Sequence, residues 1–420
     1  MVGQLAGRQR LTTMSREPSH LVIGGGVIGL CSAYFLSKAG HHVVVIDRDP
    51  TRRQSSSDRN AGMIVPSHFI PLAAPGVISQ GLKWMLSRRS PFFLRPRVDL
   101  DLWKWCWEFV NHSNQRHVDN SKDLLRDLSL ESRRMFEQLS EELGFTLVRN
   151  GLVMLCQSEA GFHEEKEVAE AANRLGIQAE VCDPERLREL DPDATMNAVG
   201  GVWFPQDAHL DSEEFLAALR QGITRNGGEF LNAEVEDFEI SGGTCKSVVL
   251  TNGERLAADH VTLACGAWSP AISRRLGLRM LMQGGKGYSF TLQKPAELPR
   301  LCSLLKEGRV AVTPMGSTLR VAGTMEICGN DLSIDRIRLG GIVDSFCRFF
   351  PKFSPGDFEG LEAWSGLRPC SPDGLPYIGR APGLSNVIVA TGHSMLGLSL
   401  GPVTGKLVTS IVAGGNADKR

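Results

Sequence analysis

The stretch "HLVIGGGVIGLCSAYFLSKAGHHVVVID", residues 20–47, decides the fold of this chain. An apolar run ends in glycines, a segment with helical spacing follows, and a second β-branched run closes on Asp47. Gly24, Gly26 and Gly29 match the pattern G-x-G-x-x-G, whose glycines permit a tight turn and the approach of a pyrophosphate to the backbone. Asp47 follows the first glycine by about 20 residues, where an acid accepts hydrogen bonds from ribose hydroxyls. The stretch therefore predicts half of a dinucleotide-binding fold, and it leaves open whether the nucleotide belongs to NAD or FAD.

The composition is that of a globular protein without affinity for nucleic acid. The 420 residues are 42% hydrophobic and 22% charged, and the net charge of -1 leaves no basic excess, so we expect no nucleic-acid partner. The ten cysteines are scattered singly and the ten histidines form no ligand-spaced cluster with them, which predicts a reduced compartment and no metal. No apolar run approaches the roughly 18 residues of a membrane span. Residues 1–17 lack an apolar signal core, so we expect a flexible leader or a misplaced start upstream of Met14.

Later segments indicate two domains that alternate along the chain. Residues 211–231 have the pattern of an amphipathic helix that turns into a strand, and residues 258–269 that of a buried strand ending in small residues. Residues 285–325 show the alternation typical of an antiparallel sheet. We therefore expect an α/β protein with a Rossmann-like nucleotide-binding domain, assembled from three segments, and an inserted α+β substrate domain that contains an antiparallel sheet. The expected ranges are 18–90, 200–270 and 360–420 for the first domain, and 91–199 and 271–359 for the second.

Residues 82–110 are apolar and basic, and they contain Trp84, Trp103, Trp105 and Trp107. One interpretation is a patch that docks on a membrane surface or a partner. The other is that the aromatic rings pack inside a helical core. The pattern leaves both open.

Five further motifs make the chain resemble the D-amino-acid dehydrogenases of the FAD-dependent D-amino-acid oxidase superfamily, over nearly everything from residue 20 to 415. They are "NAG" at 60–62, "AAPG" at 73–76, "KGYS" at 286–289, "GLRPCSPDGLPYIG" at 366–379 and "TGHSMLG" at 391–397. The resemblance implies that the cofactor is FAD, with its ADP half at the glycine turn and its isoalloxazine beside the Asn60 loop and the Gly392–His393 turn. The predicted cofactor-binding residues are Gly24, Gly26, Val27, Ile28, Gly29, Asp47, Arg48, Asn60, Ala61, Gly62, Gly266, Gly392, His393, Leu396 and Gly397.

The same resemblance implies the reaction and its catalytic residues. A D-amino acid passes its α-hydrogen to the flavin as hydride, and the imino acid product hydrolyses to a 2-oxo acid and ammonia. Arg368, in "GLRP", stands at the position of the family's carboxylate-binding arginine, and a guanidinium suits this task because it offers paired donors and keeps its charge. Tyr288 is expected to add a hydroxyl to the same carboxylate. A loop salt bridge for Arg368 and plain packing for Tyr288 are the alternatives.

Three neighbouring residues have less specific roles. Lys286 lies either near the flavin or exposed to solvent. His393 sits in a tight glycine turn, so we expect local hydrogen bonding there rather than a catalytic base. Cys370 is expected to be a small packing residue rather than a site of covalent flavin attachment.

The leading function is dehydrogenation of a D-amino acid, for example a cyclic one such as D-hydroxyproline or another D-proline derivative, with electrons passing to a quinone. The alternatives are an oxidase of glycine or sarcosine that uses oxygen, and a non-catalytic flavin-binding subunit. A subunit of that kind has no use for the carboxylate clamp of Arg368 and Tyr288, so we favour an enzyme. We expect a cytoplasmic protein, either free or peripheral on the inner face of the membrane. Residues 110–200 resemble the family only loosely, and they leave the choice of substrate open.

Overall fold

In the computed structural model, which describes residues 20–49 and 55–415, the opening stretch forms β1 (His20–Ile23), α1 (Val27–Lys38) and β2 (Val43–Asp47). The two strands pair in parallel, because the helix between them supplies the crossover. Apart from His20 and Asp47 at their ends, both are buried runs of aliphatic residues, as expected for strands covered on both faces. The strand, turn, helix and strand predicted from residues 20–47 are therefore present.

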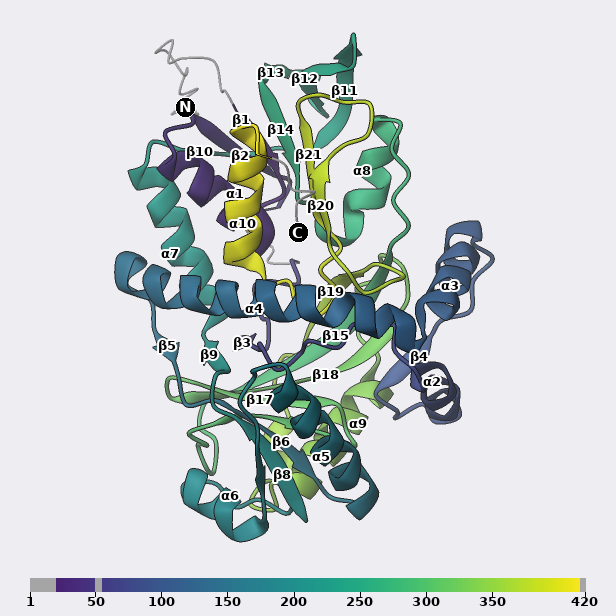
Figure 1. Ribbon diagram of the computed structural model, residues 1–420, viewed down its shortest axis with the longest axis vertical. Helices are drawn as coiled ribbons and strands as arrows, with labels where there is room; N and C mark the ends of the chain where they lie inside the picture. The colour runs from purple at the N-terminus through teal and green to yellow at the C-terminus, as the bar shows by residue number, and fades with distance from the viewer. Residues whose placement is uncertain (1–19, 50–54, 416–420) are drawn as a thin grey trace, which may run out of the picture.

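Strands β1 and β2 belong to a six-stranded sheet with the order β10-β2-β1-β14-β21-β20. Its strands run parallel except β20, which pairs antiparallel with β21. Helices α1, α7 and α10 cover one face, and the small sheet β11-β12-β13 with α8 covers the other (Figure 1). The bounds are β10 Glu229–Asn232, β14 His260–Leu263, β20 Tyr377–Arg380, β21 Val387–Thr391, α7 Ser212–Arg225, α8 Ser269–Arg275, α10 Gly401–Val412, β11 Val235–Ser241, β12 Thr244–Leu250 and β13 Arg255–Ala257.

A larger and mostly antiparallel sheet forms the other half of the molecule, in the order β19-β15-β18-β17-β16-β6-β8-β7, with β4 added beside β18. Its core is a separate apolar cluster under α9. The bounds are β4 Phe92–Leu94, β6 Leu152–Cys156, β7 Glu180–Cys182, β8 Gly200–Phe204, β15 Gln283–Leu292, β16 Cys302–Leu305, β17 Val310–Met315, β18 Thr318–Ile327, β19 Trp364–Cys370, α5 Glu159–Arg174, α6 Pro184–Leu190, α9 Arg336–Phe349 and the 3₁₀ turns η1 Gly266–Trp268 and η2 Pro355–Phe358.

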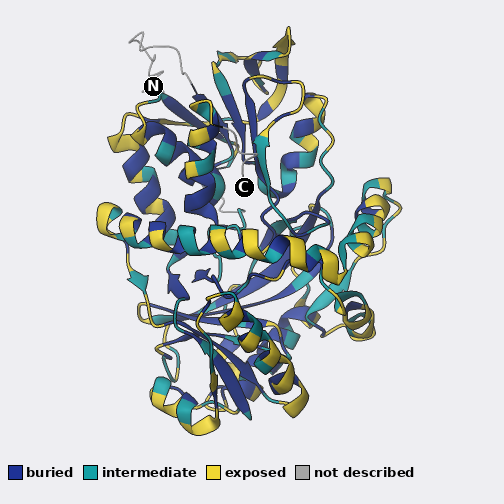
Figure 2. Ribbon diagram, viewed as in Figure 1, coloured by how far each residue is buried: buried dark blue, intermediate teal, exposed yellow. Residues whose placement is uncertain are grey.

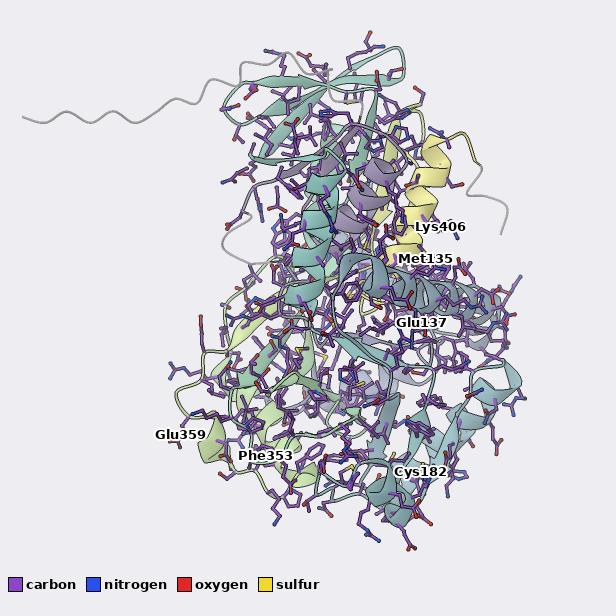
Figure 3. All side chains as sticks on the ribbon, turned by 90° about the vertical axis from the view of Figure 1, so that its left-hand side faces the viewer. Met135, Glu137, Cys182, Phe353, Glu359 and Lys406 are labelled. Carbon is purple, nitrogen blue, oxygen red and sulfur yellow. The ribbon has the colours of Figure 1, made fainter. Side chains whose placement is uncertain are left out.

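The long helix α4 (Gln115–Leu143) crosses the junction between the two halves (Figure 1). Figure 3 shows Lys406 of α10 above Met135 and Glu137 of α4, and Lys406 pairs with Glu131 of the same helix at 2.9 Å. A three-stranded sheet lies under this helix and ties the halves together, since β9 pairs with both β3 and β5. Its bounds are β3 Met63–Ile64, β5 Leu147–Val148 and β9 Ala208–Leu210.

Helices α2 (Val77–Met85) and α3 (Leu100–His112) project from the side of the molecule, and Figure 2 shows them with much of their surface exposed. The tryptophans of α3 divide between the two interpretations of this segment. Trp105 is buried, whereas Trp103 and Trp107 are 65% and 68% exposed. Within residues 20–49 and 55–415 there is no helix with the length and apolar character needed to span a bilayer.

The expected class, a Rossmann-like sheet combined with a second domain built on an antiparallel sheet, matches this architecture. Two strands that fall in the ranges expected for the first domain, β8 and β19, pair with strands of the large sheet. The division of the chain into domains stays a prediction, and the expected leader lies outside the described residues.

Candidate functional site

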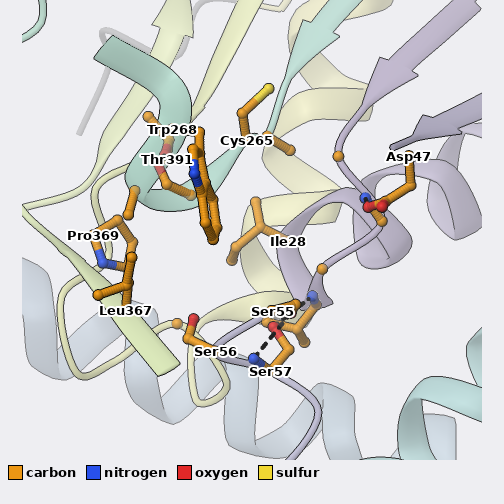
Figure 4. A pocket seen from close by; sticks show the side chains of 18 of the residues that line it. Ile28, Asp47, Ser55, Ser56, Ser57, Cys265, Trp268, Leu367, Pro369 and Thr391 are labelled. Carbon is orange, nitrogen blue, oxygen red and sulfur yellow. Dashed lines mark hydrogen bonds between the residues drawn. The ribbon is translucent and has the colours of Figure 1, made fainter. Parts of the chain in front are cut away.

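A cavity runs from the glycine turn of the first sheet to strand β19 of the second. Figure 4 shows it with Asp47 at one end and Leu367 and Pro369 at the other, and with the ring of Trp268 projecting between them. Residues 55–58 and most of residues 390–398 line it on the side of the first sheet, and Leu367, Arg368 and Pro369 of β19 line it on the side of the second. The cavity therefore lies where the two sheets meet.

The glycine turn allows the backbone to approach a phosphate closely. Gly24 has a φ of 107°, and a Cβ at this residue would lie 2.4 Å from the carbonyl oxygen of Ala264. A Cβ at Gly29 would lie 1.8 Å from the carbonyl oxygen of Gly24, so this glycine lets α1 pack against the turn. Gly26, the N-cap of α1, has no side chain to cap the helix. The N-terminus of α1 thus faces the cavity, and its dipole favours an anion there.

Asp47 is held at the end of β2 with its carboxylate at the cavity. Its Oδ2 accepts a hydrogen bond from Gly25 N at 2.5 Å, and its Oδ1 accepts one from Asp49 N at 2.8 Å. Arg48 lies over the ring of Trp268, 4.6 Å from its centroid, and pairs with Glu234 at 3.4 Å. An acidic side chain beside a glycine turn and a helix N-terminus fits the ribose and pyrophosphate of a dinucleotide.

Many of the predicted cofactor-binding residues line this one cavity. They are Gly24, Gly26, Val27, Ile28, Asp47, Arg48, Asn60, Gly266, His393 and Gly397. Four of the remaining predicted residues, Gly29, Ala61, Gly392 and Leu396, directly adjoin lining residues in the chain, and the fifth, Gly62, follows Asn60 by two positions. Contact of each residue with the cofactor stays a prediction.

The Asn60 loop is fixed to the large sheet. Asn60 Oδ1 accepts from Gly62 N at 3.0 Å, and the carbonyl of Asn60 accepts from Arg320 Nη1 at 3.0 Å. The carbonyl of Ala61 accepts from Thr313 Oγ1 at 2.6 Å. Strands β17 and β18 therefore hold this loop against the nucleotide-binding half.

His393 lies in a buried turn and bonds locally. Its Nε2 is 2.9 Å from Thr404 Oγ1, and burial lowers the pKa of the imidazole to about 3. The ring is therefore neutral near pH 7, and its hydrogen bond joins the turn to α10. Cys370 is completely buried and packs beside Trp105, whose Nε1 donates to the Cys370 carbonyl at 2.9 Å.

Arg368 lines the cavity at the end opposite Asp47. Its guanidinium lies over Gly287, because a Cβ at that residue would fall 2.4 Å from Nη1. Nη1 donates to the carbonyl of Thr324 at 2.9 Å, and Thr324 has a φ of 71° at a β-bulge between β15 and β18. Bulges of this kind re-aim groups beside active sites. The bulge and the glycine thus create the space and one acceptor for the guanidinium.

Arg368 is half-buried, and it forms no ion pair with any residue in 20–49 or 55–415. Burial lowers the pKa of the guanidinium, although an arginine stays charged at neutral pH. A poorly hydrated cation without an anionic partner binds a carboxylate or phosphate strongly. The site therefore has a positive anchor that the protein itself does not neutralise.

Tyr288 lies on the other face of β15, away from this anchor. Arg368 pairs across the sheet with Gly285, and side chains alternate along a strand, so Gly285 and Gly287 share its face while Lys286 and Tyr288 do not. The Tyr288 hydroxyl donates to Glu326 Oε2 at 3.0 Å, and the residue is not among those that line the cavity. This placement argues against the expected hydroxyl contact with a substrate carboxylate.

Lys286 fits neither of the two positions expected for it. It is 1% exposed, pairs with Asp331 at 2.9 Å and with Glu326 at 3.5 Å, and is absent from the cavity lining. The sequence "GGKGYS" indicates this placement of Lys286. Gly285 and Gly287 share one face of the strand, which leaves room there for a large group from the next strand, and Lys286 lies on the other face.

Several lining residues were not predicted, and three of them are Trp268, Arg220 and Ser394. Trp268 follows the predicted Gly266 by two positions, so the motif "GAWS" contained a signal for it. Arg220 reaches the glycine turn from α7, where Nη2 donates to the carbonyl of Gly25 at 3.3 Å. Ser394 lies in the turn after β21. Nothing in the local sequence marks Arg220, because only the packing of α7 on α1 brings it to the cavity.

Comparisons with known proteins agree on the family. A family model described as "FAD dependent oxidoreductase" matches residues 20–411. The D-amino acid dehydrogenase of Helicobacter pylori (strain J99) is 31% identical over 402 residues, which cover 95% of this chain and 96% of that protein. The D-amino acid dehydrogenase of Sinorhizobium medicae is 34% identical over 403 residues, which cover 94% of this chain and 95% of the relative.

Solved structures share the fold. Glycine oxidase from Geobacillus kaustophilus superposes with a TM-score of 0.75 at 23% identity, covering 95% of both chains. L-proline dehydrogenase from P. horikoshii gives a TM-score of 0.73 at 20% identity, covering 96% of both chains. The expected fold class is thereby confirmed, and so is FAD in the choice between NAD and FAD. This chain belongs to the family of FAD-dependent oxidoreductases.

Proposed function

We propose that the protein dehydrogenates a D-amino acid, taking a hydride from the α-carbon. The single observation that carries the proposal is Arg368, a half-buried guanidinium that lines the FAD cavity and has no ion pair among the described residues. FAD, when bound, supplies the hydride acceptor. The names of the relatives from Helicobacter pylori and Sinorhizobium medicae, both D-amino acid dehydrogenases, support an amino acid as the substrate.

The protein's own part is to bind and orient the substrate. The fork of Arg368 takes the carboxylate through paired hydrogen bonds, and the Thr324 carbonyl fixes the fork on one side. Because Gly287 leaves room above the sheet, the guanidinium lies flat over the strand rather than extending into solvent. A carboxylate held in this way fixes the position of the α-carbon. Orienting the substrate is the main contribution of the protein when a cofactor carries out the redox step.

More specifically, we propose that the D-amino acid is cyclic, for example D-hydroxyproline or another D-proline derivative. The imino acid product leaves the cavity and is hydrolysed to a 2-oxo acid or, for a ring, to its open-chain form. An oxidase of glycine or sarcosine is the alternative, and the same substrate panel separates the two.

The electrons pass to a quinone at the cytoplasmic face of a membrane. Support comes from the projecting helices α2 and α3 and the segment between them, whose surface carries large exposed apolar side chains. These are Leu82, Leu86, Val98, Leu100, Trp103, Trp107 and Val110. Lys83, Arg88 and Lys104 are exposed among them, and rings with basic neighbours suit an anionic lipid surface.

Anaerobic bleaching of the flavin tests the substrate. The FAD-loaded protein is mixed with D- and L-amino acids, D-proline derivatives, glycine and sarcosine, and loss of the oxidised-flavin absorption is followed. We expect bleaching by at least one D-amino acid, and none by the amine of the same shape that lacks the carboxylate. Bleaching by glycine or sarcosine alone, followed by rapid reoxidation in air, would favour the oxidase. No bleaching by any member of the panel would reject both.

Flotation with anionic vesicles tests the surface. We expect the wild type to float at low salt and the double variant Trp103→Ser with Trp107→Ser to stay at the bottom. The matched control is Val181→Ser, which removes an apolar side chain that is 46% exposed on β7 in the large sheet. A wild type that does not float, or a double variant that floats equally well, contradicts membrane docking by this surface.

A further inference from the structure

Two residues beside Arg368 have an unusual backbone. Within the described residues, three that are not glycine have φ in the left-handed region, namely Arg309, Thr324 and Ser394, at 49°, 71° and 49°. Such conformations cost free energy for a residue with a side chain, and they cluster at functional sites. The conformation of Thr324 directs its carbonyl to Arg368. That of Ser394 has no comparable explanation in the bonds of its own side chain.

The Ser394 hydroxyl is buried without a satisfactory partner. The residue is 7% exposed, and its Oγ has no hydrogen bond to a nitrogen or oxygen atom in the described part of the chain. Its neighbour is the Cys370 thiol, which is at best a weak hydrogen-bonding group. A buried hydroxyl in this position is unfavourable for the folded protein, since water would otherwise bond it. A glycine at residue 394 would remove this cost together with the backbone cost.

The location of Ser394 indicates what the hydroxyl serves. Its backbone N donates to the carbonyl of Pro369 at 2.9 Å, so the turn is fixed to the residue that follows Arg368. Ser394 lines the same cavity as Arg368. Met395, the next residue, also lines the cavity and is 47% exposed, so this wall lies where the cavity meets solvent. A substrate enters at such a wall, whereas Asp47 marks the opposite, nucleotide end.

Every amino acid bound at Arg368 has a second polar group, the α-amino group. Its carboxylate is taken by the guanidinium, which leaves the α-amino group with N–H donors to satisfy in a partly dry cavity. A hydroxyl oxygen with free lone pairs is a suitable acceptor for one of them. Two fixed polar contacts and the flavin face define the position of the α-hydrogen better than the carboxylate contact alone.

We propose that Ser394 is a substrate-binding residue whose hydroxyl oxygen accepts a hydrogen bond from the α-amino group of an amino acid anchored by Arg368. The proposal rests on the proposed function, because it needs an amino acid in the cavity. It adds a specificity element: Arg368 selects a carboxylate, and Ser394 selects a carboxylate with an amino group on the adjacent carbon.

The test uses the FAD-loaded protein with Ser394→Ala, which keeps the backbone strain, and Ser394→Gly, which relieves it. Both remove the hydroxyl. Arg309→Gly is the matched control, because it changes a residue with the same φ of 49° that does not line the cavity. The probes are the D-amino acid that bleaches the wild-type flavin fastest and the carboxylic acid that lacks only its amino group; for D-alanine this acid is propanoate.

We expect both Ser394 variants to raise the Kd and KM of the amino acid by about three- to tenfold, the range of one neutral hydrogen bond, while the Kd of the carboxylic acid changes less than about twofold. Ser394→Gly is expected to melt at a higher temperature than the wild type and still to bind the amino acid more weakly. A purely structural serine would not combine these results. Arg309→Gly is expected to leave both affinities unchanged.

Amino-acid affinity unchanged in both variants would overturn the proposal, and so would an equal loss for amino acid and carboxylic acid, which would mean that the serine acts through Arg368. These results are distinct from a failure of the proposed function. That failure appears in the wild type, as an absence of bleaching by every amino acid tested.

Discussion

The two ends of the cavity are built in different ways. At the nucleotide end, Gly24, Gly26 and Asp47 come from one continuous stretch. The polar groups that this stretch offers are backbone N–H groups and one carboxylate. At the substrate end, Arg368 comes from β19, the space beneath it from Gly287 on β15, and its acceptor from Thr324 on β18. One end depends on local spacing, and the other depends on the register of three strands.

The difference explains which functions can change independently. We expect a change at Asp47 to affect how the cofactor is held and to leave Arg368, the proposed substrate anchor, in place. We expect a change at Arg368 to affect the substrate and to leave the glycine turn in place, because its chain neighbours Leu367 and Pro369 lie at the end of the cavity opposite Asp47 (Figure 4). Variants at the two ends should therefore separate cofactor retention from turnover.

The largest expected effect is at the substrate end. Arg368→Ala is expected to lower kcat/KM for the amino acid, with a loss of transition-state stabilisation of about 2–5 kcal/mol, because it removes the proposed partner of a desolvated carboxylate. Arg368→Lys keeps the charge without the planar fork and is expected to lose less. FAD content, measured by absorption after acid release, should match the wild type in both. Equal turnover of the amino acid by Arg368→Ala would remove the basis for the proposed function.

Acid is expected to destabilise the fold through buried histidines. Burial lowers the pKa of His20 and of His393 to about 3 and that of His209 to about 4, so the unfolded chain takes up protons first as the pH falls below the usual 6.5. The stability from these groups is present above pH 6.5 and is lost as the pH falls. Burial raises the pKa of Asp207 to about 7, which acts in the opposite direction because the folded state keeps that proton.

Burial also lowers the pKa of His68 to about 4, and these four histidines outweigh one aspartate, so we expect a net loss on the order of 3–5 kcal/mol between pH 7 and pH 5. Thermal melting followed by circular dichroism at the two pH values measures it. The variant His393→Gln isolates the contribution of His393 to this loss, and its melting temperature should depend less on pH than that of the wild type. An identical pH dependence would mean that His393 is not a neutral buried ring.

The sequence was most informative where chemistry depends on near neighbours. The glycine turn and Asp47 are recognisable because a strand, turn, helix and strand of fixed lengths bring them together. Arg368 was found only through the motif "GLRP", since no local spacing relates it to Gly287 or Thr324. Arg220 and Ser394 escaped prediction, because one reaches the cavity by helix packing and the other is distinguished by a backbone angle.

The nucleotide end provides the next effect in size. Asp47→Ala removes the acceptor of the Gly25 N–H and the predicted acceptor of the ribose hydroxyls, so the free energy of FAD binding should weaken by about 1.5–3 kcal/mol. Quenching of flavin fluorescence on titration of the apoprotein gives the Kd. The FAD-saturated variant should keep the KM of the wild type for the amino acid. A raised KM at full FAD occupancy would show that the two ends are coupled.

The smallest effect is expected at Tyr288, where sequence and structure disagree. A tyrosine that contacts the substrate carboxylate should raise KM when its hydroxyl is removed. In the structure the hydroxyl donates to Glu326 on the face of β15 that points away from Arg368, so Tyr288→Phe should instead leave KM within about twofold and reduce the free energy of unfolding by about 0.5–1.5 kcal/mol.

Substrate kinetics and urea unfolding of the same preparation distinguish the two outcomes for Tyr288→Phe. Lys286 still pairs with Glu326 in the variant, so the carboxylate is not left without a cation, and the expected loss is that of one hydrogen bond. A tenfold rise in KM with unchanged stability would place the hydroxyl at the substrate. That result would mean that β15 changes register at its bulge when the amino acid binds, because Arg368 lies on the opposite face of the strand.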